Sequence, residues 1–249
     1  MSGNFAAKLR ERTKQAHTAA ENMGFIKCFL RGTVEKGSYR KLTSNLYFVY
    51  SAMEEEMEKH QNHPVVSKIY FTQLNRKNSL EQDLSYYYGA NWKEEISPSP
   101  AAQDYVDHIR QISASEPELL VAHSYTRYIG DLSGGQILKN IAQRAMNLSD
   151  DQGLAFYSFP DITDEKAFKN NYRQMLNELP IDEATEERIV DEAIATFDMN
   201  KNVFEELEGS LIKAIGQVLF NSLTRRHRVG STEVDPGEKS RKNKMPITG

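Results

Sequence analysis

The segment that decides the fold lies near the middle of the chain and reads Tyr125-Thr-Arg-Tyr-Ile-Gly-Asp-Leu-Ser-Gly-Gly-Gln136. Apolar residues at helical spacing flank it on both sides, which predicts a helix running through it. Three glycines within six residues would cost that helix about 3 kcal/mol relative to alanine, and they favour a kink. Because the glycines destabilise the helix, we expect this segment to have a role other than stability.

Two interpretations of these glycines are open. Gly130 and Gly134 are four residues apart and share one helix face, so a flat ligand could lie against their bare backbone. Asp131 would then stand at the ligand's edge and hold water by hydrogen bonds. The simpler interpretation is close helix–helix packing through small residues, and the glycines alone favour it.

The rest of the chain predicts a single all-α domain. Apolar residues recur three or four apart, glycine and proline are sparse, and strand signals are confined to an isolated aromatic stretch at 153–159. Asn4 and either Thr163 or Asp164 are candidate N-caps, the last helix is expected to start near Asp182, and Gly24 is a natural stop. We expect helices over 4–24, 38–61, 64–71, 79–88, 100–115, 117–148, 164–178 and 182–223, the last with a kink.

Two polar stretches are interpreted as exposed to solvent. The Glu54-Glu55-Glu56 run is expected to be a partly solvated helix face. After residue 224 the chain turns basic and then rich in Gly, Ser, Pro, Lys and Glu, without an apolar face. We therefore expect a domain over 1–224 and a polar, disordered tail over 225–249. Such a basic tail could touch anionic partners, although most are only solvated ends.

Composition excludes several classes of protein. The 249 residues carry a net charge of −4, which argues against nucleic-acid binding. Cys28 is the only cysteine, so no intrachain disulfide is possible and a reducing compartment fits. The sequence contains no phosphate-binding loop, dinucleotide fingerprint, zinc-protease motif or Glu-x-x-His pair. With no apolar span and no signal sequence, we expect a protein of the cytoplasm that does not enter a membrane.

His17 is the candidate metal ligand on the first predicted helix. It lies beside the apolar stripe, and a neutral imidazole is a good ligand for iron. Glu21 follows four residues later on the same face and could orient the ring. The alternative is a core histidine paired with Glu21. Arg10, nearly two turns earlier, could place a cation at the edge of a planar macrocycle, unless it is ordinary surface charge.

Longer stretches resemble the haem oxygenase family. The segment 118–136 is similar to its central signature, and 17–22, 46–50, 80–84, 168–173 and 197–207 also match. The likeness covers roughly residues 5–224 and is greatest for the cyanobacterial, ferredoxin-dependent branch. Animal members end in an apolar membrane anchor, whereas this chain ends in Lys244-Met-Pro-Ile-Thr-Gly249. We therefore expect no membrane residence.

The resemblance implies an all-α fold that holds haem between a proximal and a distal helix, with His17 as the axial iron ligand. The positions matching the catalytic, distal side are Asp131, Gly130, Gly134, Gly135, Arg127, Tyr50 and Asn200. Those matching haem-binding groups, including the propionate ligands, are Arg10, His17, Glu21, Tyr125, Lys169, Arg173, Phe197 and Phe204. Lys169 and Arg173, one turn apart, would otherwise be surface charges.

The resemblance also implies the reaction. Haem b would be both substrate and cofactor, and O2 with electrons from reduced ferredoxin would open it at the α-meso carbon. The products would be biliverdin IXα, carbon monoxide and ferrous iron. Biliverdin would supply bilin chromophore precursors, with a downstream bilin reductase as a further partner. A monomer is expected. Two other functions are a haem-binding or storage protein without turnover, and a helical interaction module without a cofactor.

Overall fold

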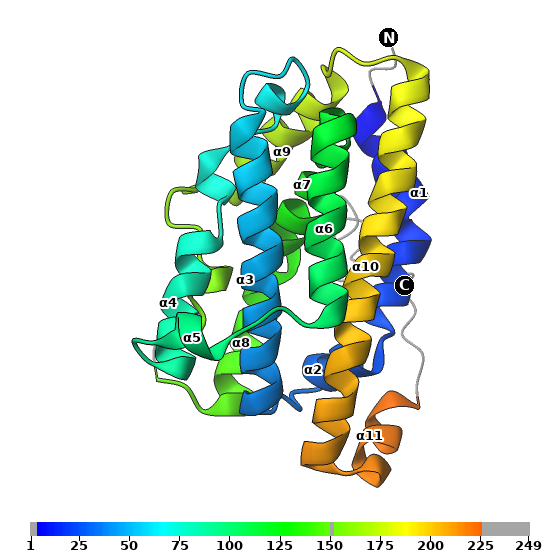
Figure 1. Ribbon diagram of the computed structural model, residues 1–249. Helices are drawn as coiled ribbons and strands as arrows, with labels where there is room; N and C mark the ends of the chain where they lie inside the picture. The colour runs from blue at the N-terminus through cyan, green and yellow to red at the C-terminus, as the bar shows by residue number, and fades with distance from the viewer. Residues whose placement is uncertain (1–3, 150–151, 226–249) are drawn as a thin grey trace, which may run out of the picture.

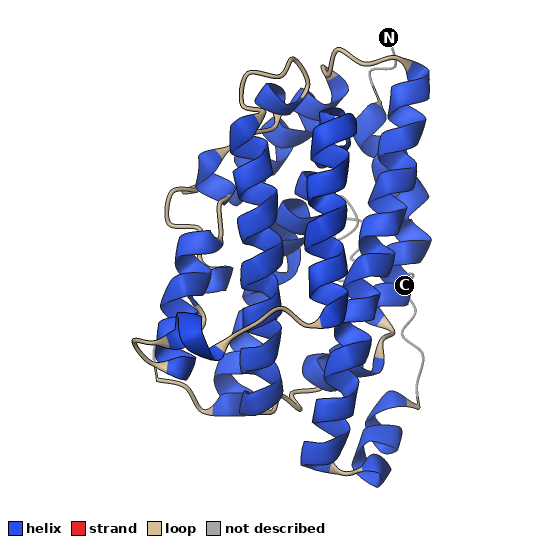
Figure 2. Cartoon of the chain, in the orientation of Figure 1, coloured by secondary structure: helices blue, strands red, loops and turns tan. Residues whose placement is uncertain are grey.

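A computed structural model describes residues 4–149 and 152–225 of the chain. Within these residues all regular structure is helical and no strand occurs, as Figure 2 shows. This confirms the predicted all-α class. The α-helices are α1 (Phe5–Glu21), α2 (Gly24–Leu30), α3 (Lys36–Lys59), α4 (Lys77–Tyr88), α5 (Trp92–Glu95), α6 (Pro100–Ser115), α7 (Leu120–Ser124), α8 (Gly130–Met146), α9 (Glu165–Asn177), α10 (Glu183–Ile215) and α11 (Gln217–Thr224).

The long helices α3, α6 and α10 run side by side, and α1 packs along the other side of α10 (Figure 1). Helix α7 packs against α10 and leads through a π-helical segment, Tyr125–Ile129, into α8. Four short 3-10 turns occur in the connections, at Val66–Lys68, Thr72–Leu74, Pro117–Leu119 and Ala155–Tyr157.

The core is rich in aromatic rings. Tyr50, Tyr105, Tyr128 and Tyr172 are among the largest fully buried side chains. Each buried aromatic ring removes about 150–250 Å² from water and contributes several kcal/mol before entropy is counted. A tyrosine also carries a hydroxyl that requires a partner inside the protein. This core is therefore well packed and also contains hydrogen bonds made by buried hydroxyl groups.

Side-chain caps define where several helices begin. Asp164 accepts the backbone N–H of Ala167 at 2.9 Å, and Asp182 accepts that of Thr185 at 2.8 Å. The first contact selects Asp164 over Thr163 as the N-cap, and the second agrees with a helix start near Asp182. Asn4 precedes α1 as predicted, but its side chain makes no capping hydrogen bond. The kink predicted in the last helix is also confirmed, because Gly216 separates α10 from α11 at φ +83°.

Gly24 was wrongly predicted as a helix stop. Helix α1 ends at Glu21, and Gly24 begins the unpredicted helix α2. A Cβ on Gly24 would lie 2.4 Å from Phe220 Cζ and 2.8 Å from Glu208 Oε1. The glycine is required because α10 and α11 approach the start of α2 at this point.

The prediction of a helix over 64–71 was also wrong, since only the 3-10 turn Val66–Lys68 forms there. Val65, Val66 and Ile69 are buried against the core. A connecting segment can thus show helical spacing because the tertiary fold buries its apolar residues. A run this short does not overcome helix nucleation by itself. The stretch 153–159 forms a 3-10 turn rather than a strand.

The Glu54-Glu55-Glu56 run is not a solvated face, because only Glu55 is exposed. Glu54 accepts the backbone N–H groups of Arg76 and Lys77 and the hydroxyl of Tyr128. Burial raises the pKa of Glu54 to about 7 despite these donors. Sequence periodicity missed this because the donors come from distant segments.

No helix of the described residues is long and apolar enough to cross a membrane. The predicted domain end at 224 coincides with the end of α11. Most of the predicted tail, 226–249, lies outside the described residues.

Replacing Glu54 with Gln should change how stability depends on pH. The pKa of about 7 in the folded protein lies above the ordinary glutamate value of 4.5, so the native state binds more protons between these values and stability falls as pH rises through them. The glutamine variant lacks this ionisation, so its free energy of unfolding should gain on wild type by up to about 3 kcal/mol from pH 4.5 to 8. Urea denaturation of both proteins at pH 4.5 and 8 measures this, and a constant difference would contradict it.

Candidate functional site

A pocket lies among α1, α2, α10 and the segment that runs from Tyr125–Ile129 into α8. Its cavity measures about 180 Å³. Apolar side chains form most of its wall, and a few polar groups enter from two sides. The lining residues are His17, Ala20, Glu21, Ile26, Leu30, Thr126, Arg127, Gly130, Asp131, Gly134, Ile137, Leu138, Phe197, Asn200 and Phe204.

Helix α1 supplies the imidazole of the pocket. His17 is partly buried, and its Nδ1 lies 4.0 Å from Glu21 Oε1 one turn further on. The ring of Phe197 on α10 meets the imidazole edge to face, with the centroids 5.5 Å apart. Helix spacing and an aromatic contact therefore orient this ring. The predicted pairing of His17 with Glu21 is confirmed as a juxtaposition.

Gly130 and Gly134 of α8 form part of the pocket wall opposite α1. The irregularity predicted near the glycines lies just before them, in the π-helical segment Tyr125–Ile129, and the helix continues through Gly130 and Gly134. Single π-helical turns are common at functional sites. A Cβ on Gly130 would have no heavy atom within 4 Å, so this glycine leaves open space in the wall. Gly135 is different, because its Cβ would pack 3.5 Å from the Tyr157 ring.

A partly buried polar network forms one side of this wall. Tyr50 donates its hydroxyl hydrogen to Asp131 Oδ2 and accepts a hydrogen bond from Arg127 Nε at 3.0 Å. Arg127 Nη1 donates to Asn200 Oδ1, and Asn200 Nδ2 donates to the carbonyl of Thr196 at 2.9 Å. The network joins α3, the π-helical segment, α8 and α10.

The electrostatics of this network are set by burial. Burial raises the pKa of the Asp131 carboxyl, and the nearby Arg127 guanidinium opposes that rise. Burial also acts to lower the pKa of Arg127, but Tyr50 and Asp131 outweigh it and the net change is upward. Arg127 therefore stays charged, and it supplies the positive charge that a buried Asp131 carboxylate requires.

Six of the fifteen predicted site residues are absent from the pocket lining. Tyr50 reaches it through Asp131, and Gly135 packs behind the wall. Tyr125 is buried, and Arg10 is an exposed residue of α1. Lys169 and Arg173 are partly buried on α9, which packs against α1. The other nine predicted residues line the pocket.

Sequence reasoning missed six lining residues: Ala20, Ile26, Leu30, Thr126, Ile137 and Leu138. A signal existed for Thr126, since Thr126, Gly130 and Gly134 repeat at four-residue spacing and share one helix face. Ile26 and Leu30 could not be found, because they belong to the unpredicted helix α2.

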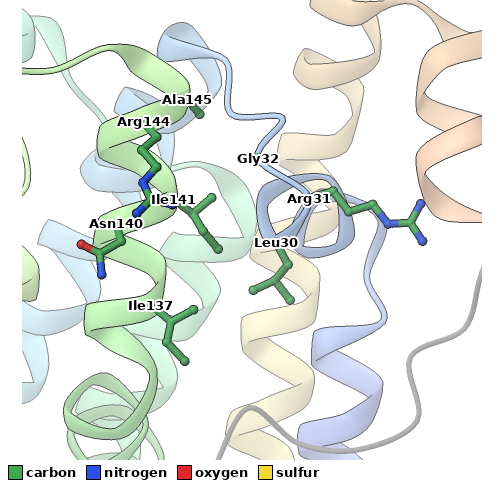
Figure 3. A pocket seen from close by; sticks show the side chains of 8 residues that line it. All are labelled: Leu30, Arg31, Gly32, Ile137, Asn140, Ile141, Arg144 and Ala145. Atoms are coloured by element: carbon green, nitrogen blue, oxygen red, sulfur yellow. The ribbon is translucent and has the colours of Figure 1, made fainter.

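A second hollow adjoins the pocket where the end of α2 faces α8. Figure 3 shows Leu30 and Arg31 on one side of it and Ile137, Asn140 and Arg144 on the other. Leu30 and Ile137 line both hollows, so these two side chains form the boundary between them.

Comparison with known proteins matches this architecture to one family. The model of the family "Heme oxygenase" matches residues 3–206. The chain is 70% identical to heme oxygenase 1 of Nostoc sp. strain PCC 7120 over 238 residues, which are 96% of this chain and 100% of that protein. The chain therefore belongs to the haem oxygenase family.

Solved structures show the same relationship. Heme oxygenase-1 from Synechocystis sp. PCC 6803, crystallised in complex with heme, is 68% identical with a TM-score of 0.84, covering 88% of this chain and 99% of that one. Heme oxygenase-2 from the same organism, in complex with heme and NO, is 50% identical with a TM-score of 0.91, covering 94% and 97%. The fold is thus that of proteins crystallised with heme.

Replacing Gly130 with Ala should stabilise the protein. The added methyl group meets no neighbour, and alanine is better than glycine within a helix, so the free energy of unfolding should rise by about 0.5–1 kcal/mol. Thermal or urea denaturation measures the change. A loss of stability would mean that this glycine is required by the fold rather than by the pocket.

Proposed function

We propose that this protein opens haem b at its α-meso carbon, using O2 and electrons from reduced ferredoxin, and releases biliverdin IXα, carbon monoxide and ferrous iron. One observation carries this proposal: an imidazole on α1 and a glycine-bearing wall with a buried carboxylate face the same pocket. Membership of the haem oxygenase family and the heme complexes of its cyanobacterial relatives support it.

The residues present fit a haem. His17 offers an imidazole nitrogen, Gly130 leaves bare backbone beside the cavity, and Phe197 and Phe204 offer apolar surface. Thr126 adds a buried hydroxyl oxygen without a hydrogen-bond partner in the described structure. The cavity of about 180 Å³ is smaller than the 300–1,000 Å³ of typical ligand pockets, so the walls must part on binding.

His17 is proposed as the axial iron ligand. Its Nδ1 faces Glu21, which leaves Nε2 as the nitrogen for ligation and lets Glu21 orient the ring. Bound haem supplies the iron and the porphyrin at which O2 is activated; this chain supplies ligation, orientation and protons.

Asp131 is proposed to organise water on the distal side. Tyr50 bonds one of its oxygens, and Arg127 keeps the network charged, so the carboxyl is held at the pocket wall as a hydrogen-bonding site for water. Water held there would deliver the protons that the reaction consumes. The glycine wall lets the backbone of α8 approach the ring, and its shape would favour attack at the α edge.

Four charged or polar residues outside the pocket lining are proposed to hold the haem propionates: Arg10, Tyr125, Lys169 and Arg173. The packing of α9 against α1 supports this assignment, because it brings Lys169 and Arg173 to the side of the molecule that carries Arg10. Arginine and lysine are the side chains best suited to carboxylates.

Ferredoxin is proposed as the electron donor because the chain resembles cyanobacterial family members. Acidic ferredoxins would dock on lysine and arginine side chains. We further propose that the protein acts as a monomer in the cytoplasm, and that its product feeds a bilin reductase in the synthesis of bilin chromophores.

Turnover of haem by the purified chain with reduced ferredoxin and O2 tests the proposed function. Decay of the Soret band with formation of biliverdin IXα, identified by chromatography, is the expected result. A stable Soret band under these conditions would instead support a haem-storage protein, and no Soret shift on haem titration would support an interaction module.

Replacing His17 with Ala should remove the axial ligand. We expect a changed Soret and visible spectrum and haem affinity lower by at least about tenfold, while the apo-protein keeps its helical circular dichroism. Haem titration followed by absorption measures both effects. Restoration of the native spectrum by added imidazole would show that ligation, not folding, was lost, and an unchanged spectrum without imidazole would refute the assignment.

Replacing Asp131 with Asn should leave haem bound but lower biliverdin formation by about 100-fold, because proton delivery contributes about 10²–10⁴-fold to such catalysis. Single-turnover measurement with ferredoxin separates this loss from any change in haem affinity. Asp161→Asn, at an exposed position outside the pocket, is the matched control. Normal turnover by the Asp131 variant would refute the proposed water-organising role.

A further inference from the structure

Three side chains with metal-ligating atoms meet outside the haem pocket. His108 comes from α6, His123 from α7 and Glu192 from α10, and one ligand atom from each lies within 4.8 Å of the other two. Their helices pack against one another, as Figure 1 shows for α6 and α10. None of the three lines the pocket.

Both imidazoles converge on a single carboxylate oxygen. Glu192 Oε1 lies 2.7 Å from His108 Nε2 and 2.8 Å from His123 Nε2. Two imidazoles and one carboxylate form a common donor set for zinc and other first-row transition metals, whereas Mg²⁺ prefers oxygen ligands alone. The donor atoms of the cluster therefore favour a divalent cation of intermediate hardness, such as zinc, over Mg²⁺.

The surroundings of His123 hold its ring in a ligating orientation. His123 is fully buried, and its Nδ1 lies 3.3 Å from Thr196 Oγ1. The Thr196 hydroxyl donates its only hydrogen to the carbonyl of Glu192 at 2.9 Å, so its oxygen can accept from Nδ1–H. That tautomer leaves a lone pair on Nε2 facing the Glu192 carboxylate, and a cation between the two atoms satisfies both. Ligating histidines commonly hold their second nitrogen this way.

The opposite tautomer gives a hydrogen-bonded cluster without metal. In it, His123 Nε2–H donates to Glu192, and Nδ1 accepts from the Tyr105 hydroxyl at 3.4 Å. This contact is long for an O–H donor, whose usual range is about 2.5–3.0 Å. The Thr196 contact of the first tautomer is nearly as long at 3.3 Å, so the contacts at Nδ1 are compatible with both tautomers. A metal ion would displace the Nε2 proton and select the tautomer in which Nδ1–H faces Thr196.

We propose that His108, His123 and Glu192 bind one divalent transition-metal ion of the zinc type, with water completing tetrahedral coordination. Donor–metal distances of about 2.0–2.2 Å place tetrahedral donors about 3.3–3.6 Å apart, so each imidazole nitrogen would move away from the carboxylate oxygen by about 0.5–0.9 Å. The His108 side chain is 33% exposed and can make this movement, and it also opens the cluster to solvent.

The ion would connect α6 and α7 to α10, which carries Asn200 of the polar network, and α7 leads directly into the segment that carries Arg127. His123 lies four residues before Arg127, and Thr196 lies four residues before Asn200. A ligand that binds only the native state stabilises it by mass action. The proposed ion therefore stabilises the fold at the helices that hold Arg127 and Asn200.

Zinc titration of the haem-free full chain tests this site. Isothermal titration calorimetry with ZnCl2 should show one equivalent bound, and zinc should raise the melting temperature. Co²⁺ should give the intense visible absorption of tetrahedral coordination, and MgCl2 should give no binding. His108→Gln keeps a hydrogen-bond donor for Glu192 but removes the imidazole, so zinc affinity should fall by about 100-fold and the thermal shift should vanish.

Two matched variants separate this cluster from other histidines. His63→Gln and His17→Gln change histidines outside the cluster and should keep both the zinc affinity and the cobalt absorption. The proposal is overturned if wild type binds no zinc, if His108→Gln binds it as tightly as wild type, or if His17→Gln abolishes binding. None of these readouts requires haem turnover, so they stand apart from the test of the proposed function.

Discussion

The site depends on one pair of opposite charges at the pocket wall. Asp131 and Arg127 lie within four residues of each other and are both partly buried, so removing either would leave the other charge poorly compensated. Tyr50 and Asn200 complete the arrangement from α3 and α10. The network ties the pocket wall to two of the longest helices, so the position of the wall follows from hydrogen bonds rather than from apolar packing alone.

That constraint explains the placement of the glycines. Because hydrogen bonds fix the position of this helix, its pocket-facing side can lack side chains without the pocket closing. Gly130 leaves such an opening. Gly135 instead faces the Tyr157 ring. The two glycines thus differ: Gly130 leaves the space that the ligand interpretation requires, and Gly135 packs against a ring of the 3-10 turn Ala155–Tyr157. The irregularity in the helix falls at the π-helical turn Tyr125–Ile129, where the wall enters the pocket.

The same helices carry a second polar cluster one turn away from the network. His123 precedes Arg127 on the chain, and Glu192 and Thr196 precede Asn200 on α10. Buried polar groups on neighbouring turns share partners, and this links the proposed metal site to the pocket wall through Thr196. The cluster draws its ligands from three helices, so no Glu-x-x-His spacing marks it in the sequence.

The amino-acid sequence by itself determined the helical class, most helices, the cap at Thr163 or Asp164 and the helix start near Asp182, because these follow from local spacing and local hydrogen bonds. Nine predicted site residues were found at the pocket because they belong to long recognisable motifs. Only the tertiary structure decided that Gly24 begins a helix, that Glu54 is buried, and that Ile26 and Leu30 line the pocket. Each of these depends on contacts between segments far apart in the chain, and local periodicity cannot predict such contacts.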